Sequence, residues 1–101
     1  MSEVRWARLA ESLAAVGVAA RVDVTPYPGG VNRSVTLKAG NSLIEVSDAW
    51  WRKNPDIWIG WQVHIEGRQD SIVKRTWPVT KKRSEVVAAV REALAGANGR
   101  P

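Results

Sequence analysis

The strongest constraint on the fold is a run of five strand-like segments, joined by short connections, in the middle of the chain. Four of them alternate apolar and polar residues, and this period of two is typical of a β-strand with one buried face. Short links join antiparallel neighbours, because a parallel pair needs a crossover of roughly a dozen residues or more. The sequence therefore predicts a five-stranded antiparallel meander, with strands at residues 20–25, 31–39, 42–48, 57–66 and 71–77.

A helical period replaces the strand period at both ends of this run. Apolar residues recur at helical spacing over residues 3–16 and again over Ser84–Ala95, and Gly96 is placed to end the second helix. Both apolar stripes are buried together with one sheet face if the two helices pack on the same side of the sheet. The predicted fold is a two-layer α+β domain, α-β-β-β-β-β-α, over residues 1–96, with a flexible tail at 97–101.

The segment 57–66 is expected to be a central strand, because every second residue from Ile57 to Ile65 is apolar. The residues between them then face the wet side of the sheet, and three of these are Trp58, Gln62 and His64. A large aromatic side chain is unusual on a solvated face. This parity therefore makes the outer face of the predicted strand a candidate contact surface.

Six tryptophans stand beside one tyrosine and no phenylalanine. Trp6 and Trp61 fit apolar stripes and are expected in the core. Trp50 and Trp51 are consecutive and precede the expected loop at residues 52–56, so their side chains point to opposite sides and at least one ring should lie outside the core. Exposed Trp is enriched among the residues that dominate binding interfaces. We therefore expect a non-enzymatic module that engages a protein partner, or a second copy of itself, through the open sheet face. The predicted contact residues are Trp50, Trp51, Trp58, Gln62 and His64.

The net charge of +5 is carried entirely by residues 71–101, because residues 1–70 hold eight basic and eight acidic side chains. Five of the basic residues lie within ten positions that contain no acid, and a tryptophan is interleaved. Such a segment can hold phosphates while the ring stacks on bases. The alternative function is therefore a small nucleic-acid-binding accessory protein that uses Lys74, Arg75, Trp77, Lys81, Lys82 and Arg83.

Catalytic and metal-binding residues are sparse in the sequence. The chain has no cysteine, which excludes disulfides, thiolate metal sites and cysteine nucleophiles. His64 is the single histidine, and although Glu66 shares its predicted face, one histidine without cysteines does not build a usual zinc site. We therefore expect no enzyme, no cofactor and no metal. No apolar run approaches the ~20 residues of a membrane span, and the expected location is the cytoplasm.

Overall fold

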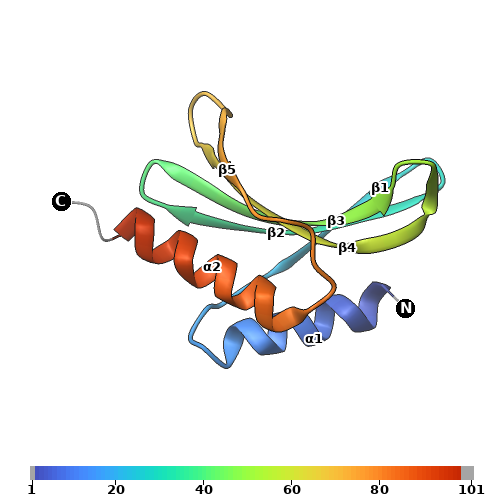
Figure 1. The fold of residues 1–101 in the computed structure, drawn as a ribbon, viewed down its shortest axis with the longest axis horizontal. Coiled ribbons are helices and arrows are strands. Elements are labelled where there is room, and N and C mark those ends of the chain that lie inside the picture. Colours follow the sequence, from blue (N-terminus) through green and yellow to red (C-terminus); the bar gives the residue numbers. More distant parts are fainter. Residues whose placement is uncertain (1, 99–101) are drawn as a thin grey trace.

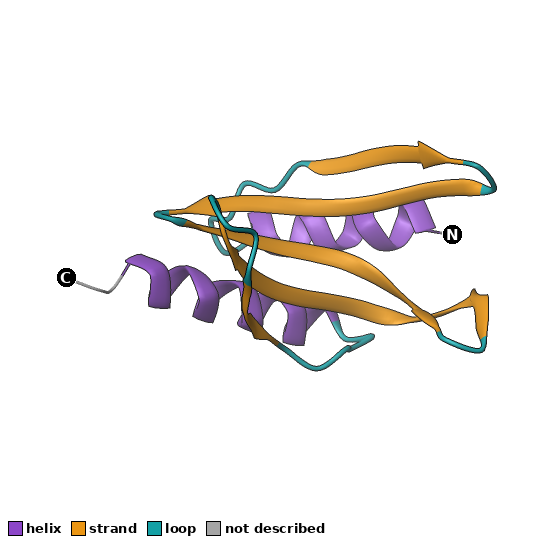
Figure 2. Ribbon diagram, turned by 90° about the horizontal axis from the view of Figure 1, so that it is seen from above, coloured by secondary structure: helices purple, strands orange, loops and turns teal. Residues whose placement is uncertain are grey.

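The computed structural model describes residues 2–98, which form a five-stranded antiparallel sheet with both helices on one face (Figures 1 and 2). The strands are hydrogen-bonded in chain order, β1-β2-β3-β4-β5. The predicted two-layer α+β meander is therefore confirmed. The elements are α1 (Ser2–Ala14), β1 (Val22–Tyr27), β2 (Gly30–Ala39), β3 (Ser42–Trp51), β4 (Asn54–Gly67), β5 (Val73–Thr76) and α2 (Arg83–Asn98).

The core lies between the helices and the inner face of the sheet. Trp6 of α1 packs edge to face against Trp61 of β4, with 6.3 Å between the ring centroids, and both rings are buried. Burying one large aliphatic side chain, such as the leucines and valines that surround these rings, contributes roughly 1.5–3 kcal/mol. The helices and the three central strands supply the other large buried residues, which are Leu9, Leu13, Val35, Ile44, Val46, Val63, Val86 and Val90.

The loop predicted at residues 52–56 is shorter than expected, because β3 and β4 continue into a tight hairpin. β3 runs to Trp51 and β4 begins at Asn54, which leaves a two-residue turn. Pro55 is tolerated in the strand because Trp51 pairs with Asn54 and Trp50 with Trp58, so residues 55–57 have no partner position on β3. The Asn54 side chain also accepts a hydrogen bond from the Asp56 amide at 3.0 Å.

The predicted unbroken apolar face of β4 is also wrong. Gly60 pairs with Ala49 and Trp58 pairs with Trp50, so Ile59 is an extra residue that forms a β-bulge. The bulge shifts the alternation by one residue, which turns Trp58 toward the helices and its neighbours Ile57 and Ile59 away from them. The bulge needs a glycine: Gly60 has a φ of 140°, and a Cβ there would lie 2.5 Å from the Thr80 carbonyl oxygen.

The ends of several elements differ from the prediction by a few residues. β5 is shorter than the predicted strand 71–77, and the helix α2 continues through Gly96, because one glycine costs a helix only about 1 kcal/mol relative to alanine. The last three positions of the predicted tail at 97–101 lie outside the described residues. Between residues 2 and 98, neither helix is long and apolar enough to cross a membrane.

Candidate functional site

The five residues that the sequence analysis placed on one surface are divided between the two faces of the sheet. Gln62 and His64 lie on the open face, opposite Ser47 and Glu45 of β3. Trp58 lies on the helix side, where its ring packs edge to face against Trp61 with centroids 5.0 Å apart. Trp50 pairs with Trp58 and falls on the same side by alternation along β3, so of the tryptophans proposed for the patch only Trp51 remains on the open side.

Asp48 explains why Trp58 turns inward. One carboxylate oxygen of Asp48 accepts a hydrogen bond from the Trp58 indole at 2.8 Å, and the other accepts from the Trp6 indole at 3.0 Å. The Arg5 guanidinium lies 4.0 Å above the Trp58 ring, which adds a cation–π contact. Both oxygens of the carboxylate are thus used to join β4 and α1. Trp58 is therefore part of the packing between the helix and the sheet.

A group of exposed apolar side chains lies at the end of the β3–β4 hairpin. Trp51 and Ile57 are each 44% exposed and Ile59 is 36% exposed. We call Trp51, Ile57 and Ile59 the hairpin cluster. The strand that carries two of them has an open edge: among residues 2–98, the first backbone pairing on that side of β4 is between Trp61 and Thr80. The amides and carbonyls of residues 55–59 on that side therefore have no strand beside them.

The opposite edge of the sheet differs from this one. β1 has six residues and contains Pro26, which has no amide hydrogen to offer to an added strand. Arg21 and Asp23, at its start, form an exposed ion pair at 3.6 Å. Charge and proline are two devices by which natural sheets discourage pairing at an edge. The segment of β4 before Gly60 also contains a proline and a charge, Pro55 and Asp56, but two exposed isoleucines follow them at positions 57 and 59.

A second group on the open face consists of Glu45, His64 and Glu66, which we call the Glu–His–Glu cluster. The Nε2 atom of His64 lies 3.8 Å from Oε1 of Glu45, and one side-chain ligand atom from each of the three residues lies within 4.8 Å of the other two. The sequence analysis paired His64 only with Glu66, two residues along the same strand. It missed Glu45 because the partner of His64 depends on the register between β3 and β4, which residues 55–57 and Ile59 shift by four positions; counting back from the turn alone would have paired Glu45 with Gly60.

The basic segment is divided between the two ends of α2. The Arg75 guanidinium donates to Glu92 at 2.9 Å and stacks on Trp77 at 4.2 Å, and the Trp77 indole donates to the same carboxylate at 3.2 Å. The hydrogen bond from Arg75, followed by that from Trp77, lowers the pKa of Glu92. Lys81, Lys82 and Arg83 are exposed at the start of α2, about 14 Å along the helix from Glu92 at 1.5 Å per residue.

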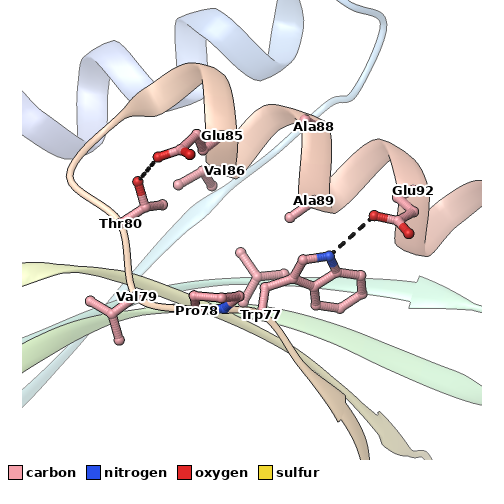
Figure 3. A pocket seen from close by; sticks show the side chains of 10 residues that line it. Trp77, Pro78, Val79, Thr80, Glu85, Val86, Ala88, Ala89 and Glu92 are labelled. Atoms are coloured by element: carbon pink, nitrogen blue, oxygen red, sulfur yellow. Dashed lines mark hydrogen bonds between the residues drawn. The ribbon is translucent and has the colours of Figure 1, made fainter.

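A cavity of about 290 Å³ lies between α2 and the segment that follows β5 (Figure 3). Its walls are mainly apolar and include Val63, Trp77 and Ala89. The polar groups at its rim bond to one another, because Thr80 donates to Glu85 while Trp77 donates to Glu92. The cavity therefore offers a small apolar space with its nearby carboxylates already engaged.

Comparisons of this chain with models of protein families, with curated proteins and with solved structures find no match. The function must therefore be argued from the surface features of the chain itself. Two groups of side chains do not contribute to the packing of the core: the hairpin cluster beside the open edge of β4, and the Glu–His–Glu cluster on the open face.

Proposed function

We propose that this domain is a protein-binding module that accepts an extended segment of a partner along the free edge of β4, between Asn54 and Gly60. The observation that carries the proposal is the combination of unpaired strand edge and exposed apolar side chains at the same place. An added strand gains affinity from main-chain hydrogen bonds and specificity from side chains that contact alternate residues. Ile57 and Ile59 are two residues apart, which matches that alternation.

The partner segment is expected to be acidic. Arg52 and Lys53 form the turn immediately beside the hairpin cluster, and Asp56 is the one acidic residue in the sequence between Trp51 and Gly60. A positive surface attracts an acidic segment and disfavours a second copy of the same positive chain. The proposed occupant is therefore an extended peptide that alternates apolar and acidic residues. Self-association through the same edge becomes an outcome that the experiment distinguishes.

Nucleic-acid binding, the alternative from the sequence, has weaker support in the geometry. Arg75 and Trp77 are engaged with Glu92, and Lys81 to Arg83 lie at the other end of α2. Trp77, the aromatic ring of this segment, is partly buried, so it is not free to stack on a base. A phosphate-binding protein would lose affinity steeply as salt rises, and the peptide experiment below includes this measurement.

The first test is selection of random displayed peptides against the immobilised chain. We expect the recovered sequences to alternate apolar with acidic residues, because the edge provides apolar contacts next to positive charge. A double variant, Ile57→Asp with Ile59→Asp, should weaken the best peptide by ~10-fold or more, since it replaces both central contacts with repulsive charges. Binding should persist at moderate salt, because main-chain hydrogen bonds and apolar contacts are not screened as phosphate contacts are.

The matched control is Val24→Asp on β1, which places the same charge on the opposite edge at an exposed valine. It should leave peptide affinity unchanged. The proposal fails if no peptide is enriched, or if the enriched peptides bind the double variant as well as the wild type. It also fails if light scattering shows a concentration-dependent dimer that the double variant abolishes, because the occupant would then be a second copy of the chain.

A further inference from the structure

We propose that Glu45, His64 and Glu66 form a binding site for a divalent transition metal ion, of which Zn²⁺ is the best match. The site lies on the open face of the sheet, away from the free edge of β4, and does not depend on the proposed strand-binding function. It differs from the expectation of no metal drawn from the sequence. That expectation considered one histidine on one strand, whereas the fold brings a carboxylate from a second strand beside it.

The sheet register fixes the backbone of all three residues. Glu45 of β3 lies directly opposite His64 of β4, and Glu66 follows His64 by two residues, so the three side chains leave the same face as adjacent neighbours. Their side chains are partly shielded, with His64 18% and Glu45 33% exposed. Both strands are internal to the sheet, because β2 and β5 lie on either side. A site built on such strands needs little ordering when an ion binds.

The spacing of the ligand atoms is close to that of a bound ion. Zinc bonds to imidazole nitrogen and carboxylate oxygen are about 2.0–2.2 Å long, which places two ligands of a tetrahedral ion roughly 3.4 Å apart. The Nε2–Oε1 distance between His64 and Glu45 is 3.8 Å, and all three atoms lie within 4.8 Å of one another. Contraction by about 1 Å requires only rotation of the two flexible glutamate side chains.

The ion pairs seen within residues 2–98 join no lysine or arginine to either carboxylate of the cluster. Two carboxylates share the site, and the ion pairs seen within residues 2–98 include only one that reaches either of them, the contact between Glu45 and His64. With a neutral imidazole the cluster carries two negative charges, which a divalent cation neutralises. The presence of an imidazole favours zinc and its neighbours over Mg²⁺ or Ca²⁺, which take oxygen ligands. Three protein ligands leave a coordination position open for water.

The test is calorimetric titration of ZnCl₂ into the full chain without an affinity tag, because tag histidines would bind the ion. We expect one equivalent to bind and the thermal midpoint of unfolding to rise, since an ion that binds only the folded form stabilises it. His64→Gln, Glu45→Gln and Glu66→Gln should each weaken zinc binding by ~10-fold or more. Mg²⁺ at the same concentration should give no comparable heat or shift.

The matched control is Glu11→Gln, which removes an exposed carboxylate from α1, far from the cluster in the fold. It should bind zinc as the wild type does. Circular dichroism of each variant without metal separates a lost ligand from a lost fold, and zinc affinities are compared among the folded variants. The proposal is overturned if the wild type binds no zinc at millimolar concentration. It is equally overturned if folded variants at all three positions retain wild-type affinity.

Discussion

The two halves of β4 form one continuous strand but have different surroundings. Residues Trp61–Gly67 lie between β3 and β5 with the helices across one face, and their apolar side chains are buried or partly buried. Residues Asn54–Gly60 have only β3 as a neighbouring strand, and although Trp58 packs toward α1, Ile57 and Ile59 are exposed. Figure 2 shows the sheet with the helices covering one side of it. The covered half supports the fold, and the uncovered half is where we place the partner.

This difference shows that strand propensity and burial are set by separate causes. Isoleucine suits a β-strand in both halves, and tryptophan does too, so the local sequence favours an extended chain over residues 57–67. Burial then depends on which residues have a helix or a second strand next to them. Gly60 divides the halves, because its bulge redirects Trp58 inward and leaves the two isoleucines outward. Each prediction below changes one side of this division or the division itself.

The largest expected effect comes from the covered half. Trp61→Ala should lower the free energy of unfolding by roughly 3–5 kcal/mol, because it removes a buried ring that contacts both Trp6 and Trp58. Trp51→Ala, at the other end of the hairpin, should lower it by about 1 kcal/mol or less, because that ring is already 44% exposed. Urea denaturation of both variants at one pH provides the comparison. Equal losses would show that the uncovered half is as important for folding as the covered one.

The second effect concerns the boundary. Gly60→Ala should destabilise the domain by roughly 1–3 kcal/mol. Alanine resists the φ of 140° at this position, and its Cβ would meet the Thr80 carbonyl. Gly96→Ala is the matched control: it lies in α2 with nothing within 4 Å of the added carbon, and it should stabilise the helix by up to about 1 kcal/mol. Opposite signs in thermal denaturation would identify the bulge as the cause. A neutral Gly60→Ala would mean that the strand relaxes without cost.

The bulge at Ile59 is also the feature of the sheet that the sequence did not predict. Connection lengths and periodicity were enough for the strand order and for both helices, since those depend on local pattern. They were not enough for the face of Trp58, because one extra residue at Ile59 reverses every assignment before it. The partnership of Glu45 with His64 was missed for a related reason. It depends on four residues of β4 without a partner on β3, residues 55–57 and Ile59, which shift the register between the turn and His64.

The smallest expected effect concerns the hydrogen bonds between α2 and the segment of Arg75 and Trp77, which follows the covered half of β4. Arg75 and Trp77 both donate to Glu92, and these bonds lower the pKa of its carboxyl group. The folded form therefore gains stability from the ionised carboxylate, fully above the ordinary glutamate pKa of about 4.3. This gain is lost as the pH falls through the lower pKa of the folded state.

Glu92→Gln should therefore be less stable than the wild type near neutral pH, and the gap should close as the pH falls toward 3. The gap should be small, because the ion pair is exposed to solvent and is screened. Arg75→Gln removes the donor with the larger influence on Glu92 and should reproduce most of the gap, while the double variant should add little to either single change. Thermal midpoints measured from pH 7 to pH 3 would show this pattern. A gap that persists unchanged at pH 3 would mean that Glu92 stabilises the domain by packing and not by charge, and β5 would then be tied to α2 by Trp77 alone.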